Sequence, residues 1–161
     1  MSKFYITTPI YYVNDIPHIG HTYTTVAADA LSRFFRLLGK KVFLLTGTDE
    51  HGAKILEKAT ELNKQPKEFC DEIAEKFKTV WKEMNISYNY FIRTTDSTHE
   101  AAVRKFLQEM YRKGEIYKAN YDGLYCIQCE KFLTETEMTP DAYCPDHKVK
   151  LVRHREENYF F

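Results

Sequence analysis

The apolar residues of the chain alternate between short β-type runs and longer stripes with helical spacing, and this alternation constrains the fold most. Residues 3–8 and 42–46 are rich in aromatic and β-branched side chains, which favour strands. Residues 90–92 form a third, shorter run of the same kind. Strands that alternate with helical segments predict an α/β fold with a parallel sheet.

Between the first two strands, apolar residues recur at steps of three and four, which predicts a helix with one buried stripe. Pro17 suits its first turn, and Gly39 suits the position just after its end. Residues 42–46 form a continuous apolar run, so we expect both faces of the sheet to be covered. Further helices are expected to begin near residues 52, 66 and 97. The expected buried stripe comprises Tyr23, Val26, Ala27, Ala30, Leu31, Phe34, Leu37 and Leu38.

Composition excludes several classes of protein. Basic and acidic residues number 23 each, and 43% of the 161 residues are hydrophobic. A chain this apolar is not disordered, and a zero net charge gives no general attraction for nucleic acid. The apolar runs are far shorter than the roughly 20 residues that cross a bilayer. No signal peptide is recognisable either, so we expect a cytoplasmic protein with reduced thiols.

The residue composition of the chain changes near Gly114. The part that follows contains short aromatic runs and three of the four cysteines. We therefore expect two domains, residues 1–113 and residues 114–161. The chain ends on three aromatic residues, 159–161, which water solvates poorly. They either form an edge strand covered by their own module or pack on a part of the protein beyond the given sequence, and we favour the second interpretation.

Two histidines, His18 and His21, stand where the first strand leads into the first helix. Positions three apart share a helix face, so both imidazoles can reach one ligand. The N–H groups and dipole at a helix N-terminus attract phosphate, and Gly20 leaves room for a flat ring to approach the backbone. Two simpler interpretations stay open: the histidines cap the helix or pack in the core, or they ligate a metal.

An acidic residue, Asp49, follows the second strand. Ligands of open α/β sheets bind beyond the carboxyl ends of the strands, where a carboxylate can hold an ammonium group or a ribose hydroxyl. Asp is also a preferred N-cap residue, and the two interpretations are equally supported by the sequence.

Two short pairs of metal-binding residues lie in the last third of the chain. Cys126 and Cys129 form a C-x-x-C pair, and Cys144 and His147 form a C-x-x-H pair after the 14 intervening residues 130–143. This spacing matches a closed tetrahedral zinc site with a structural role. A redox pair or a coincidence are the alternatives. Cys70 stands alone and is expected to be buried as a small apolar residue.

Several of these segments occur in the same order in one known family. Residues 9–14 and 17–21 resemble the opening of methionyl-tRNA synthetases, and residues 46–52 resemble a second segment of that family. The four candidate zinc ligands resemble its zinc knuckle, and residues 157–161 are also similar to it. The resemblance covers the whole chain.

This resemblance implies a class I synthetase with a Rossmann-like parallel sheet in residues 1–113. Residues 114–161 would form a zinc-binding insertion that is incomplete at its C-terminus. The implied activity is that of a methionine-tRNA ligase, which converts methionine and ATP, with Mg²⁺, to methionyl-adenylate and pyrophosphate and then transfers the methionyl group to tRNA(Met).

The resemblance also assigns roles to individual residues. His18 and His21 would be catalytic and would bind ATP together with Gly20. Methionine would bind to Ile10, Tyr12 and Asp49. One structural zinc ion would bind to Cys126, Cys129, Cys144 and His147.

The sequence departs from the family in one respect. The lysine-rich loop ending in Lys-Met-Ser-Lys-Ser, which should come much later, is not found. The chain therefore resembles the N-terminal part of the enzyme, without the anticodon-binding domain, and should be weakly active or inactive alone. The rest of the synthetase is expected to pack on the C-terminal aromatics. Alternatives are a non-catalytic zinc module that binds RNA or a protein partner, a synthetase for another amino acid, and a small nucleotidyltransferase.

Overall fold

The computed structural model describes residues 2–161, and the chain divides into two compact units, Met1–Val103 and Arg104–Phe161. Helix α4 (Ser97–Arg112) runs across this point of the chain. The functional domain boundary near residue 114 stays a prediction.

A parallel sheet organises the first unit, as the alternation of the sequence predicted. Its strands lie in the order β1-β2-β3, and both pairings are parallel. The elements of this unit, in chain order, are β1 (Lys3–Tyr12), α1 (Ile19–Leu37), β2 (Lys41–Asp49), α2 (Ala53–Glu61), α3 (Pro66–Glu83) and β3 (Tyr90–Arg93).

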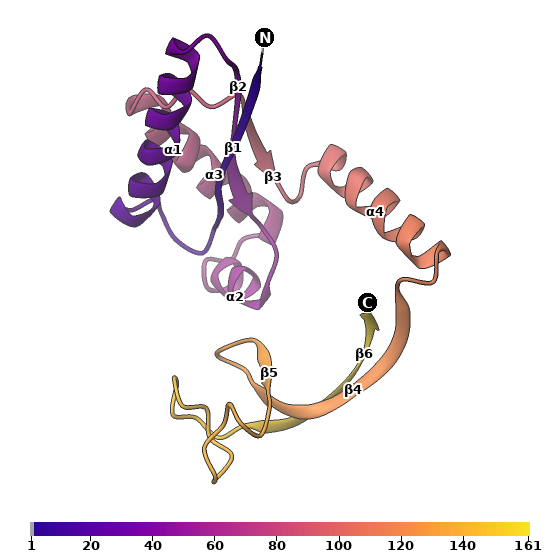
Figure 1. Ribbon diagram of the computed structural model, residues 1–161. Helices are drawn as coiled ribbons and strands as arrows, with labels where there is room; N and C mark the ends of the chain where they lie inside the picture. Colours follow the sequence, from indigo (N-terminus) through magenta and orange to yellow (C-terminus); the bar gives the residue numbers. More distant parts are fainter. Residues whose placement is uncertain (1) are drawn as a thin grey trace. The chain divides into compact units, whose positions relative to one another are not determined.

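The helices α1 and α3 lie on the same side of this sheet (Figure 1). Both connections step in the same direction across the sheet, and right-handed crossovers then place their helices on one face. Val42, Leu44 and Thr46 point to this face and are buried, whereas Phe43 and Tyr5 point to the other face and are exposed. The expectation that both faces are covered is therefore wrong for this chain.

Helix α1 packs with a different side from the one the sequence predicted. Its buried residues are Thr25, Ala28, Asp29 and Ser32. Most of the expected stripe faces away from the sheet, and Leu37 is 87% exposed. Two of the buried polar residues have partners: the hydroxyls of Thr25 and Tyr11 lie 2.8 Å apart, and Asp29 accepts a hydrogen bond of 2.8 Å from the backbone N–H of Ser87. Among the described residues, the buried hydroxyl of Ser32 has no hydrogen-bond partner. The spacing of apolar residues contains no information about such hydrogen-bond partners, so it predicted that the opposite face of the helix is buried.

The ends of α1 follow the expectation in part. Gly39 has a φ of 73° just after the helix, where a residue without a side chain adopts the left-handed conformation most easily. Pro17 precedes the first turn and does not lie within it, because the N-cap is His18.

The core of the first unit forms around the apolar face of α3, the helix that was expected to begin near residue 66. Its buried residues include Phe69, Ile73, Phe77 and Trp81. Tyr11 of β1 stacks on Phe77 with ring centroids 5.6 Å apart. The core contains, in addition, Val13, Ile55, Ala59, Cys70, Ala74 and Phe91. Burial raises the pKa of the Cys70 thiol to about 11, which agrees with its expected role as a small apolar residue.

The second unit is an antiparallel sheet of three strands in the order β5-β4-β6 (Figure 1). These strands are β4 (Tyr117–Cys126), β5 (Lys131–Leu133) and β6 (Val152–Phe160). Strand β6 pairs with β4 along its whole length, from Tyr125↔Val152 to Tyr117↔Phe160. The terminal aromatics up to Phe160 thus belong to an edge strand. Within residues 2–161, no helix is both long enough and apolar enough to cross a membrane.

Gly47 allows β2 and β3 to pair closely. A Cβ atom at this position would lie 1.9 Å from the carbonyl oxygen of Ile92, which is backbone of the neighbouring strand and has no room to move. We expect Gly47→Ala to lower the free energy of unfolding by about 3 kcal/mol, as overpacking of a rigid contact does. Urea denaturation followed by circular dichroism measures this change.

Gly39→Ala is the matched control, since nothing lies within 4 Å of its added methyl group. Its cost should be only the backbone strain of about 1 kcal/mol. Equal losses for the two variants would contradict the collision at Gly47.

Candidate functional site

The pairing of β1 with β2 places three predicted site residues on one face of the sheet. Ile10 lies opposite Gly47, and Tyr12 lies opposite Asp49. The register shifts between Thr7 and Ile10. An irregularity of this kind reverses which side chains point to each face. As a result Tyr11 turns toward the helices and is buried, while Ile10 and Tyr12 are exposed on the open face.

Asp49 is the last residue of β2 and is partly exposed. It follows the buried Thr48, so strand alternation directs its side chain to the same open face as Tyr12. The N-cap of helix α2 is Gly52, three residues further on. The interpretation of Asp49 as an N-cap is therefore wrong.

His18 and His21 cap the N-terminus of α1, as one of the open interpretations proposed. The Nδ1 of His18 accepts a hydrogen bond of 3.1 Å from the backbone N–H of Gly20. The Nδ1 of His21 accepts one of 3.2 Å from the backbone N–H of His18. Because each Nδ1 is an acceptor, the proton of each neutral ring must be on Nε2. Both rings therefore present an N–H donor through Nε2.

The two imidazoles stack with centroids 3.8 Å apart, and His21 also lies 4.8 Å from the ring of Tyr11. Burial, together with the neighbouring His18, lowers the pKa of His21. His21 is therefore neutral at pH 7 and acts as a hydrogen-bond donor without carrying a charge.

Gly20 has a role in this cap that the sequence did not reveal. A Cβ atom there would lie 2.9 Å from Cε1 of His18. Gly20 is therefore the residue that lets the His18 ring fold back over the helix end.

A buried ion pair lies next to Asp49, and the sequence did not indicate it. The side chain of Glu50 is fully buried and pairs with Arg93 at the end of β3, with Nε and Oε1 2.6 Å apart. Burial by itself raises the pKa of Glu50, but hydrogen bonds from Arg93, Thr95 and Thr48 outweigh this and hold the pKa below its usual value. No feature of the sequence indicated that Glu50 is buried or that its partner lies 43 residues away.

Three thiols and one imidazole converge in the second unit. The ligand atoms of Cys126, Cys129, Cys144 and His147 all lie within 4.8 Å of one another. The Sγ atoms of Cys129 and Cys144 are 3.5 Å apart, and Nδ1 of His147 lies 3.1 Å from Sγ of Cys129. Two thiolates bound to one tetrahedral zinc ion at 2.3 Å each lie about 3.8 Å apart. The group can therefore hold a metal ion.

Each pair of ligands is carried by a similar tight turn. The residue after the second ligand has a left-handed backbone conformation in both turns: Glu130 has a φ of 54° and Lys148 a φ of 55°. These non-glycine residues are unusual in this conformation, which costs about 1 kcal/mol for each. The turns accept this cost because they direct both ligands of a pair to the same point.

The acid–base properties of this cluster fit a cation. A hydrogen bond from the backbone N–H of His147 lowers the pKa of Cys144 to about 6. Burial and the neighbouring thiols raise the pKa of Cys129 to about 12. Adjacent thiols resist ionising together, and a bound cation removes this conflict. The redox interpretation fits less well, because Cys126 ends a strand and does not begin a helix.

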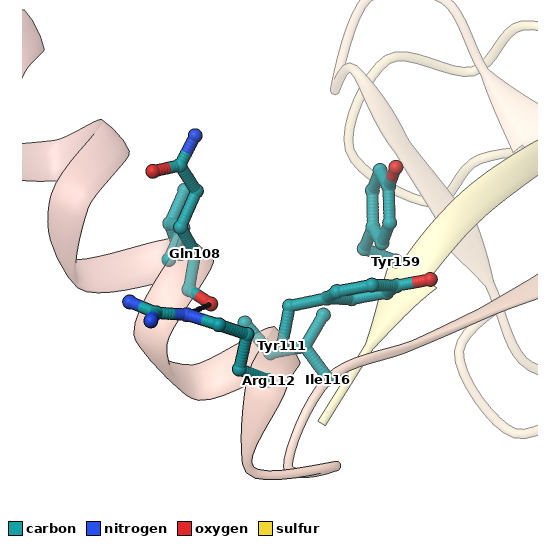
Figure 2. Close-up of a pocket in the computed structure, with 6 residues that line it drawn as sticks. Gln108, Tyr111, Arg112, Ile116 and Tyr159 are labelled. Atoms are coloured by element: carbon teal, nitrogen blue, oxygen red, sulfur yellow. Dashed lines mark hydrogen bonds between the residues drawn. The ribbon is translucent and has the colours of Figure 1, made fainter.

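A cavity of about 500 Å³ lies elsewhere in the second unit (Figure 2). Tyr111 and Tyr159 lie beside it, and Arg112 hydrogen-bonds to the carbonyl oxygen of Gln108. Its remaining lining residues are Leu107 and Ile116. None of the predicted site residues lines this cavity.

Comparison with known proteins identifies the class to which this arrangement belongs. The family model described as "tRNA synthetases class I (M)" matches residues 4–158. The chain is therefore a class I aminoacyl-tRNA synthetase sequence, with the parallel sheet and histidine-bearing helix start described above.

Individual relatives narrow the assignment. Over 99% of the length of this chain, its sequence is 52% identical to the methionine-tRNA ligase of Thermotoga maritima. Over 98% of this chain, it is 50% identical to the chloroplastic/mitochondrial methionine-tRNA ligase of Arabidopsis thaliana. It matches a Mycobacterium tuberculosis methionyl-tRNA synthetase in complex with methionyl-adenylate at 35% identity and a TM-score of 0.88, covering 100% of this chain and 32% of that one. The chain belongs to the methionyl-tRNA synthetase family. It spans about a quarter, 26%, of the length of the two curated relatives.

The capping role of His18 is separable from any role of its imidazole in chemistry. Asn is a good N-cap residue and Ala is a poor one. We expect His18→Ala to lower the free energy of unfolding by about 1 kcal/mol and His18→Asn to lower it much less. Urea denaturation of both variants tests this, and equal stability of the two would contradict the cap.

Proposed function

We propose that the protein to which this chain belongs is a methionine-tRNA ligase. It would form methionyl-adenylate from methionine and ATP and then transfer the methionyl group to tRNA(Met). The observation that carries this proposal is the arrangement at the carboxyl ends of β1 and β2, where Ile10, Tyr12 and Asp49 share one face. The helix start with its two imidazole donors adjoins them through the contact of His21 with Tyr11.

In this proposal Asp49 holds the amino group of methionine by a charge-assisted hydrogen bond. Ile10 and Tyr12 line the amino-acid pocket. Their exposed apolar surfaces are suited to contact with an apolar side chain. The carboxylate of methionine then attacks the α-phosphate of ATP, and pyrophosphate leaves.

The histidines would stabilise the phosphates during this step. His18 and His21 donate through Nε2, and Gly20 lies at the backbone that the nucleotide approaches. Phosphoryl transfer depends on positioned donors and charge more than on covalent partners, so two fixed N–H groups are suited to it. Mg²⁺ would accompany ATP as part of the substrate.

We further propose that the cluster of Cys126, Cys129, Cys144 and His147 binds one zinc ion. Four protein ligands leave no position for water, so the ion would hold the module together and take no part in the reaction. Thiol ligands must stay reduced, which is consistent with a cytoplasmic location.

The same proposal assigns a role to each part of the chain. Residues 1–113 would be the nucleotide-binding half-domain, and residues 114–161 the connective insertion. The remaining chain of the longer protein would pack on the C-terminal aromatics, where Tyr159 is 56% exposed and borders the cavity of Figure 2. A non-catalytic zinc module is not favoured, because it leaves the first unit without a role. A synthetase for another amino acid stays an outcome of the test.

The test is amino-acid-dependent exchange of pyrophosphate into ATP by the full-length protein. We expect exchange with methionine and little with leucine, isoleucine or cysteine. Replacing His21 with Asn should lower kcat about 100-fold, the usual effect of losing one transition-state donor. Asp49→Asn should raise the KM for methionine at least about tenfold, because a charge-assisted bond is lost.

His154→Asn is the matched control, because His154 lies on β6 and belongs to no predicted site. The isolated 161-residue chain should be weakly active or inactive. Full activity of His21→Asn, or exchange that prefers another amino acid, would contradict the proposed function.

Metal content tests the zinc site separately. We expect about one zinc per chain, and chelation should increase hydrogen exchange in residues 124–151 while β1 and β2 stay protected. Cys144→Ser should lose the metal, whereas Cys70→Ala, at a cysteine outside the cluster, should keep it. A folded module without metal would refute the assignment.

A further inference from the structure

We propose that Arg93 is a positioning residue for methionine: through Glu50 it fixes the backbone that carries Asp49. This inference rests on the proposed function, because it concerns how Asp49 is held. The residues involved come from β2, α3 and β3 and the turn that follows it.

The carboxylate of Glu50 is fully paired. Arg93 donates to it twice, from Nε at 2.6 Å and from Nη2 at 2.8 Å. The hydroxyl of Thr48 donates to Oε1 at 2.7 Å, and that of Thr95 to Oε2 at 2.5 Å. A bidentate guanidinium–carboxylate pair fixes direction as well as distance.

The backbone around Glu50 also has partners in other elements. Its N–H donates to the hydroxyl of Thr94 at 2.8 Å, and the same hydroxyl lies 3.0 Å from Nδ1 of His51. The thiol of Cys70 lies 3.9 Å from the carbonyl oxygen of Glu50. The end of β2 is thus tied to the end of β3 and to α3.

The side chain of Asp49, unlike that of Glu50, is not enclosed by the protein. Its side chain points to the open face, and Glu50 points into the protein. The direction of Asp49 therefore depends on the anchored residue that follows it. A ligand carboxylate must be held within a fraction of an ångström to be effective, so this anchor matters for binding.

A structural purpose alone explains this pair poorly. Burying an ion pair gains little stability over well-packed apolar residues, whereas it does fix geometry. Arg93 is only 13% exposed, and its second partner, Asp71, is 47% exposed. The contact with Glu50 is thus the one shielded from water, and the one expected to determine position.

Arg93→Lys in the full-length protein tests this inference. Lysine keeps the charge but loses the bidentate geometry. We expect the KM for methionine in pyrophosphate exchange to rise about tenfold, while the KM for ATP changes less than about threefold. In the Asp49→Asn background the same change should add less than about a twofold effect, because Arg93 acts through Asp49.

Two controls separate positioning from general loss of structure. Asp71→Asn leaves the Glu50 contact in place and should have a small effect. Lys64→Met removes the pair of Lys64 with Glu72 on α3 and should leave both KM values unchanged. If Arg93→Lys does not fold, the double variant Arg93→Met/Glu50→Gln, which leaves no unpaired buried charge, should show the same selective rise in KM for methionine.

The outcomes are distinct. No methionine-dependent exchange by the parent protein overturns the proposed function and this inference with it. An active parent whose Arg93→Lys variant loses kcat with unchanged KM for methionine, or whose effect multiplies fully with that of Asp49→Asn, overturns the inference alone.

Discussion

The parallel pairing of β1 with β2, with its single shift of register, is the constraint on which the first unit depends. Parallel strands bring their carboxyl ends to one edge, and the crossover between them starts a helix at that same edge. The shift between Thr7 and Ile10 then turns Tyr11 into the core and its two neighbours outward. Without this shift, Tyr11 would point to the open face and lose its contact with Phe77, and its two neighbours would point toward the helices.

The second unit depends on a different constraint. Its buried cluster consists of four residues, Cys126, Leu133, Cys144 and Leu151, with a few partly buried side chains packed against them, which is a small apolar core for a domain. Two of these four residues are also ligands of the candidate metal site. Core and metal site are therefore the same structure, and metal binding and folding of this unit should be coupled.

Local patterns in the sequence predicted some features of both units, but they failed for one face of the first unit. The three strands of the first unit, the start of helix α3 at Pro66 and the convergence of the four ligands followed from local patterns, since periodicity and short ligand spacings are properties of neighbouring residues. The buried face of α1 did not follow. Thr25 and Asp29 are buried because Tyr11 and Ser87 provide them with hydrogen bonds, and these partners are distant in sequence.

The sequence by itself determined the order of elements up to α4, the family and the four-residue ligand set, because each of these depends on residues close together or on motifs in a fixed order. Only the tertiary structure decided which face of the sheet stays open, that Asp49 ends a strand and caps no helix, and that Glu50 meets Arg93. These depend on strand register and on the direction of the crossovers. Both are set by burial and hydrogen bonding between segments that no local pattern connects.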